Sequence, residues 1–158
     1  AYLPYANLSG ASAVQADFTD AFFCRSILKD VILAGAVMVN ADFTEADLTG
    51  AVLRDAVMQG ARLSGANLSH IEASCVDLTD SVLDGANLAG ADLREACLAG
   101  ATMHGANLVH ADLSYADLTG ASLAGSLLSG ANLAGANLAG AILDDVDLRD
   151  VDLSEVDL

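Results

Sequence analysis

A five-residue pattern repeats without interruption from Ala1 to Leu158. Written in rows of five, the chain gives 31 complete rows and a final three residues. The third position of every row is Leu, Phe, Met or Ala, and the first is Ala, Ser, Val or Ile. All 14 glycines stand at the fifth position. So strict a period means that one small structural unit is repeated along the whole chain.

The period also selects the secondary structure. On an α-helix, successive third positions would step about 140° around the axis, so the leucines would form no single apolar face. In an extended segment, positions one and three point the same way and position two points oppositely. Asp or Asn fills 16 of the 32 second positions. Each row is therefore predicted to be a short extended side, apolar inside and polar outside, followed by a corner at positions four and five.

One such row cannot bury its leucine by itself. The rows must wind into coils that stack through parallel backbone hydrogen bonds, about 4.8 Å apart. Burial of the 24 third-position leucines, at roughly 2 kcal/mol each, supplies an adequate core. The sequence therefore predicts an all-β fold, a single β-solenoid domain over residues 1–158.

Several rows resemble those of a known family, the pentapeptide repeat proteins, and the resemblance covers the whole chain. The rows that carry it are ADLTG at 46–50 and 116–120, ANLAG at 86–90, 131–135 and 136–140, and ADLRE at 91–95. The resemblance implies a right-handed parallel quadrilateral β-helix with four rows to a square coil. About eight coils would then stand roughly 38 Å tall. The best understood branch of the family, the quinolone-protecting proteins, mimics duplex DNA and binds DNA gyrase.

Charge narrows the range of partners. The chain has 22 acidic and six basic residues, a net charge of −16, which argues against direct binding to nucleic acid. Residues 80–158 carry 13 acids and two bases, against nine and four in residues 1–79. An acidic DNA mimic that binds gyrase or topoisomerase is one interpretation, and acids that only keep the rod soluble are another. The candidate acidic partner face comprises Asp92, Asp112, Asp147, Asp152 and Asp157.

A second candidate surface is apolar. Every second position between residues 21 and 40 is Phe, Ile or Val, although this position should face solvent. The interpretation is a docking band for a partner protein; alternatively, β-branched residues stand there because they favour strands. The predicted band comprises Tyr2, Phe22, Ile27, Ile32, Val37, Val52 and Val57.

Catalytic and cofactor sites are not expected. The three cysteines fall on different faces, and the three histidines are too dispersed for a zinc site. A filled convex rod offers no pocket for a catalytic set. The uncharged stretch 118–143 contains Asn, Ser and Gly, so we expect no membrane span. The sequence predicts a non-enzymatic structural or protein-interaction solenoid without cofactor or metal, a passive spacer being a further alternative, and it indicates no cellular compartment.

The two ends of the solenoid are predicted to be covered in different ways. Tyr2, Pro4 and Tyr5 are expected to cover the first coil. The last rows keep the repeat and supply no cap, so Leu148, Leu153 and Leu158 are expected to meet a second copy. The prediction is an end-to-end homodimer through the C-terminal coil, which the acids there would oppose at low salt.

Overall fold

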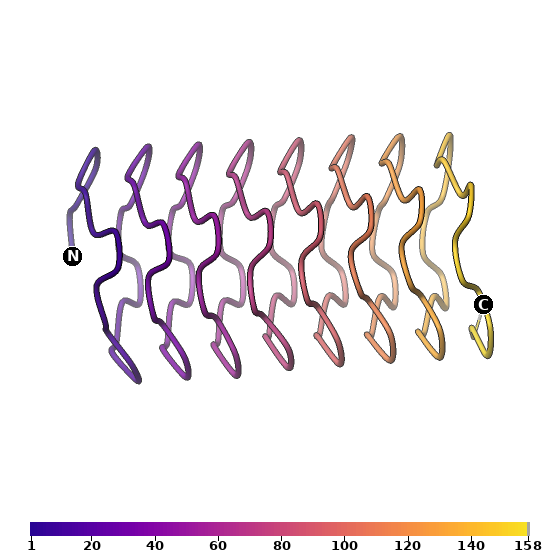
Figure 1. Cartoon of the computed structure of the whole chain (residues 1–158), viewed down its shortest axis with the longest axis horizontal. Helices are drawn as coiled ribbons and strands as arrows, with labels where there is room; N and C mark the ends of the chain where they lie inside the picture. Colours follow the sequence, from indigo (N-terminus) through magenta and orange to yellow (C-terminus); the bar gives the residue numbers. More distant parts are fainter. Residues whose placement is uncertain (158) are drawn as a thin grey trace.

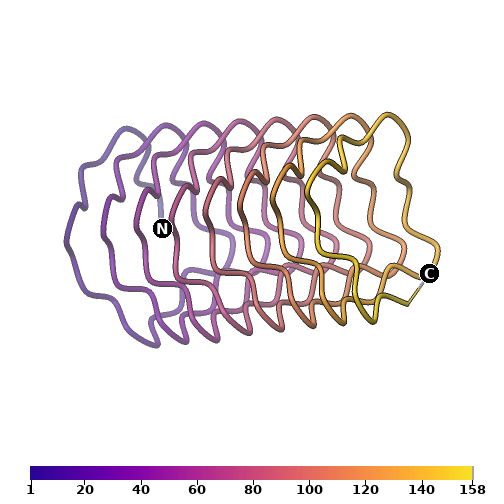
Figure 2. The ribbon, with the colours of Figure 1, turned by 45° about the vertical axis from the view of Figure 1, so that its right-hand side comes forward.

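The computed structural model describes residues 1–157 and shows a rod of stacked square coils (Figures 1 and 2). The two ends of the chain lie at opposite ends of the long axis (Figure 1). We number the coils by twenties, so that coil 1 is residues 1–20 and coil 8 begins at residue 141. The fold is the right-handed quadrilateral β-helix that the resemblance to pentapeptide repeat proteins implies.

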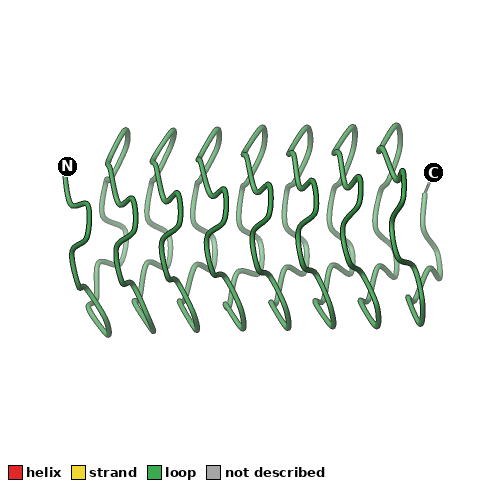
Figure 3. Cartoon of the chain, turned by 90° about the horizontal axis from the view of Figure 1, so that it is seen from above, coloured by secondary structure: helices red, strands yellow, loops and turns green. Residues whose placement is uncertain are grey.

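Neighbouring coils are joined by one residue on each side of the square. The second-position residue forms a parallel bridge to the residue twenty positions later, from Tyr2 with Phe22 to Asn137 with Asp157. The Phe22 N–H donates to the Ala1 carbonyl at 2.9 Å, and the Phe22 carbonyl accepts from the Leu3 N–H at 2.8 Å. Within residues 1–157 these bridges stay isolated, with no helix and no longer strand, so Figure 3 draws the chain as loop.

The corners depend on left-handed backbone at the fifth position. All 31 fifth positions have φ between 53° and 69°, which glycine adopts without strain and Asp or Asn tolerates better than most residues. Gly90 has a further reason to lack a side chain. A Cβ atom there would lie 2.7 Å from Nδ1 of His70, whose imidazole leans over this corner from the preceding coil.

The first and third positions fill the bore, as predicted. All of them are buried from residue 21 to residue 138. Near the N-terminal end the filling is aromatic: the Phe23 ring stacks on Phe43 at 4.9 Å and meets Phe18 edge-on at 5.3 Å. The described residues contain no helix of the length and apolarity that crossing a membrane requires.

The predicted lid on the first coil is wrong. Tyr2 and Tyr5 are 78% and 70% exposed and project outward, because second and fifth positions both face away from the bore. The end of the bore holds an apolar cavity of about 270 Å³ instead. It lies where the small Ala13 takes a position usually held by Leu, and Leu3, Leu8 and Phe18 contribute to its wall. At the other end, Leu148 and Leu153 are 39% and 46% exposed, and Leu158 lies outside the described residues.

Candidate functional site

The predicted apolar band does not form one continuous surface. Its members in coil 2 lie on four different faces, and Ile27 has polar bridge neighbours, Asn7 and Asp47. Tyr2 and Phe22 form a separate pair on another face, with ring centroids 5.9 Å apart.

Four of the predicted residues do come together. Ile32 bridges to Val52 on one face, and Val37 bridges to Val57 on the next face. The corner between the two faces carries Ala34 and Gly35 in coil 2, where the Gln15 side chain approaches Gly35 from coil 1, and Arg54 and Asp55 in coil 3. Ile32 is exposed, and the three valines are half-buried. We call Ile32, Val37, Val52 and Val57 the apolar patch.

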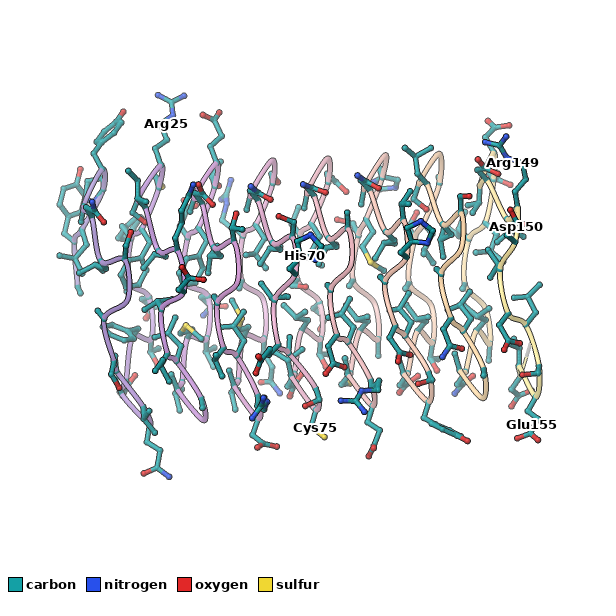
Figure 4. All side chains as sticks on the ribbon, viewed as in Figure 1. Arg25, His70, Cys75, Arg149, Asp150 and Glu155 are labelled. Carbon is teal, nitrogen blue, oxygen red and sulfur yellow. The ribbon has the colours of Figure 1, made fainter. Side chains whose placement is uncertain are left out.

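The predicted acidic face is likewise divided. Asp92 and Asp112 are bridge neighbours on one face, and Asp152 lies on the same face beyond Asn132. Asp147 and Asp157 stand on the two adjoining faces of coil 8. Figure 4 shows Arg149 and Glu155, also of this coil, projecting away from the rod. The C-terminal acids therefore surround the coil and do not form a stripe.

Second-position acids have a local structural role that the sequence analysis missed. The Asp117 Oδ1 atom accepts hydrogen bonds from the backbone N–H of Thr119 at 3.0 Å and from its hydroxyl at 2.5 Å. The same contact recurs at Asp112, whose Oδ1 accepts from the Ser114 N–H at 3.0 Å. Such Asx turns satisfy a corner N–H that the interstrand ladder leaves free. The recurring Asp-Leu-Thr and Asp-Leu-Ser rows are the signal for it.

At some second positions such hydrogen bonds lower the carboxyl pKa. At Asp17 the N–H and hydroxyl of Thr19 lower the carboxyl pKa. The Arg94 guanidinium does the same at Asp92, where Nε lies 2.7 Å from Oδ1 and Nη2 lies 2.8 Å from Oδ2. Asp17 and Asp92 therefore carry their negative charges at neutral pH.

A column of asparagines ties three coils together on one face. Asn87 Nδ2 donates to Asn67 Oδ1, and Asn107 Nδ2 donates to Asn87 Oδ1, each at 3.1 Å. The three amides stack because the residues are twenty apart and so take the same place in successive coils. This column stabilises the fold.

One cluster was missed altogether. His104 Nδ1 lies 2.9 Å from Asp84 Oδ1, and His104 Nε2 lies 2.8 Å from Ser122 Oγ. Equivalent positions of neighbouring coils are twenty residues apart, but Ser122 and His104 are eighteen apart. That separation recurs between Thr49 and Asn67, so it was readable in the sequence once the coil length was known.

The described residues hold no other concentration of metal-binding or redox groups. They contain no group of three or more His, Cys, Asp or Glu side chains placed to hold a metal ion. All three cysteines, Cys24, Cys75 and Cys97, are free thiols.

Comparison with known proteins accords with the architecture. None of the curated proteins compared matches the chain significantly. Among solved structures, QnrB1, described as a plasmid-mediated fluoroquinolone resistance protein, superposes with a TM-score of 0.83 at 19% identity, over 96% of this chain and 78% of its own. Rfr23, a pentapeptide repeat protein from the cyanobacterium Cyanothece 51142, is 31% identical over 64% of this chain and 63% of its own, with a TM-score of 0.50.

The family assignment rests on the repeats themselves. Eight copies of the family described as pentapeptide repeats match the sequence. The matched segments are 1–30, 32–69, 61–99, 74–108, 86–125 and 121–158. Because these segments take in nearly every residue, and the four-row coil is the fold of the similar structures, the chain belongs to the pentapeptide repeat family.

Proposed function

We propose that the chain is an interaction scaffold that binds another protein through the apolar patch. The observation that carries the proposal is the pairing of Ile32 with Val52 on one face and of Val37 with Val57 on the adjoining face. Clustered aliphatic side chains on a soluble surface are typical of protein contacts.

The fold does not require these side chains to be apolar. The core is filled by first and third positions, and many second positions elsewhere are Asp or Asn. An aliphatic residue at the second position also cannot accept a hydrogen bond from a corner N–H, as Asp117 does from the Thr119 N–H. The competing explanation is that β-branched residues stabilise the ladder themselves. The two explanations differ in what happens when the patch is made polar.

The charge of the rod limits the kind of partner. With a net charge of −16, the surface favours a partner that has an apolar centre and a basic rim. Such a partner would associate faster at low salt, because the charges around the patch steer the encounter.

The test is the double variant Ile32→Asp with Val37→Asp, compared with Leu127→Asp with Ile142→Asp. Leu127 and Ile142 are also exposed second-position residues, but they lie outside the patch. Quantitative affinity capture should retain the same partner with wild type and the control pair and lose it with the patch variant, while circular dichroism stays unchanged. Equal capture by all three proteins would show that the patch binds nothing.

A second candidate is DNA mimicry directed at gyrase or topoisomerase. The supporting observation is the number of acids: 22 along a rod whose length carries about 22 phosphates in duplex DNA. The fluoroquinolone resistance protein with the same fold gives this candidate a precedent. In a supercoiling assay, the wild-type rod should inhibit gyrase or protect it from a quinolone, and Asp147→Asn with Asp152→Asn and Asp157→Asn should weaken the effect. No effect at any ratio of rod to enzyme would exclude this candidate.

A further inference from the structure

We propose that Ser122 is an activated nucleophile, able to take an acyl group from small esters, with His104 as its general base and Asp84 as the residue that positions His104. The three side chains come from successive coils, so the solenoid itself, without any loop, brings them together. Hydrogen-bonded Ser, His and Asp in this order are the recognised arrangement for nucleophilic acyl transfer.

The direction of each hydrogen bond follows from the chemistry of the groups. An ionised Asp84 only accepts, so in the neutral imidazole Nδ1 carries the proton and Nε2 is the acceptor. Ser122 Oγ therefore donates to Nε2, so His104 is placed to remove the serine proton as the oxygen attacks. Asp84 Oδ1 also accepts the backbone N–H of His104 at 2.9 Å, which fixes the carboxylate against the imidazole.

A donor for the developing oxyanion stands beside the serine. Among the described residues, the Ala124 N–H has no hydrogen-bond acceptor. In the row of Asp117, by comparison, the second-position carboxylate accepts a hydrogen bond from the N–H two residues later, that of Thr119. The serine side chain is shorter and bonds His104 instead, so this N–H stays free as a donor two residues after the nucleophile.

The surroundings limit the substrate to small, unhindered esters. Ser122 is only 9% exposed and lies on a convex face, without a pocket to hold a large substrate. Access comes from the neighbouring corner, where Gly105 and Gly125 carry no side chain and a Cβ atom would meet nothing within 4 Å. Ile142, 48% exposed, is the bridge neighbour of Ser122 and offers an apolar contact to the acyl group. The negative charge of Asp84 disfavours anionic esters.

The reaction balances without a cofactor. Ser122 Oγ forms a bond to the ester carbonyl carbon as its proton passes to His104 Nε2. The bond from that carbon to the leaving oxygen then breaks, and the proton on Nε2 goes to the leaving alcohol. Water repeats the sequence on the acyl-serine, releasing the carboxylic acid and restoring the hydroxyl group.

The experiment is covalent labelling with a biotinylated alkyl fluorophosphonate, followed by peptide mass spectrometry. The expected product is a Ser122 phosphonate ester, in which an O–P bond has formed and fluoride has left. Labelling should be absent in Ser122→Ala and slower by about 100-fold or more in His104→Gln. His110→Gln, a surface histidine on another corner, is the matched control and should label at the wild-type rate.

Ser114 is an internal control in every sample. Its hydroxyl bonds a carboxylate, Asp112 at 2.7 Å, with no histidine among its hydrogen-bond partners. Equal labelling of Ser114 and Ser122, no labelling of the wild type, or an unchanged rate in a folded His104→Gln protein would each overturn the proposal. The positioning role of Asp84 is tested by NMR: the downfield Nδ1–H resonance of His104 should disappear in Asp84→Asn, and Ser122 labelling should slow in the same variant.

Discussion

At the scale of the residue, each position in the row has a distinct task, and exceptions are informative. First positions lie inside the bore, where Ala is usual and Ser occurs at residues 26, 81 and 126. Ser26 Oγ donates to the Phe23 carbonyl at 2.6 Å, whereas the hydroxyls of Ser81 and Ser126 are buried without a partner. A buried hydroxyl that makes no hydrogen bond opposes folding.

Ser126→Ala is therefore expected to stabilise the protein. Removing the unpaired hydroxyl should raise the free energy of unfolding by about 1 kcal/mol. Ser26→Ala is the matched control, because it removes a hydroxyl that has a partner and should leave stability unchanged or lower it. Urea denaturation followed by circular dichroism measures both variants. A Ser126→Ala protein no more stable than Ser26→Ala would contradict this account.

The Asp92 carboxyl gives a prediction about pH. Its pKa is below the ordinary value of 3.8, chiefly because Arg94 donates to it. A lowered pKa in the folded state contributes stability at pH values above the ordinary pKa, and that contribution is lost as the pH falls through the lowered value. In Arg94→Gln the Asp92 pKa should rise, as measured by carbon-detected NMR titration. The difference in unfolding free energy between wild type and Arg94→Gln should accordingly be present at neutral pH and vanish in acid.

Arg62→Gln serves as the control for this titration. It removes the same charge from another face and should leave the Asp92 pKa unchanged. If both arginine variants moved that pKa equally, the general field of the rod, and not the contact with Arg94, would be its cause.

At the scale of the element, the sequence predicts the coil well and the contacts between coils only in part. The five-residue period and the choice between helix and extended chain follow from residue spacing, because every coil obeys the same rule. The column through Asn87 was also predictable, since bridge partners are twenty apart. The outward direction of Tyr2 was not predicted. The position of a residue in its row, and not its aromatic character, decides whether its side chain faces the bore. The contact between His104 and Ser122 joins residues that are eighteen apart. Aligning equivalent positions, which are twenty apart, does not reveal it.

The asparagine column should contribute measurably to stability. Asn87 donates to Asn67 and accepts from Asn107 and from the Ala89 N–H, so Asn87→Ala leaves several partly buried groups unpaired. The expected cost is about 1–2 kcal/mol in the free energy of unfolding. Asn7→Ala is the control, because Asn7 bonds only Ser9 in its own row and should cost less. Equal costs would show that the amides do not reinforce one another between coils.

At the scale of the whole molecule, the rod is a one-dimensional stack, and its order is weakest where coils have a neighbour on only one side. Backbone hydrogen bonds of 2.7–3.1 Å link the coils in the middle of the chain. In coil 8 the Asp147 N–H lies 3.3 Å from the Ser126 carbonyl of coil 7, and the turn hydrogen bond from the Val156 N–H to the Leu153 carbonyl, within coil 8, is 3.4 Å long. The same coil exposes Leu148 and Leu153, so its surface is both apolar and highly acidic.

A protein made of residues 1–158 is expected to form an end-to-end homodimer through this coil, with an affinity that rises with salt. Contact between two copies would cover Leu148 and Leu153, while Asp147, Asp152 and their neighbours repel across the junction until salt screens them. Multi-angle light scattering at low and high ionic strength measures the effect. Leu148→Glu with Leu153→Glu should remove the dimer, and Leu127→Glu, on the side of the rod, should leave it intact. A monomer at every salt concentration, or a dimer that weakens as salt is added, would contradict the predicted junction, because screening of the like charges should strengthen this contact.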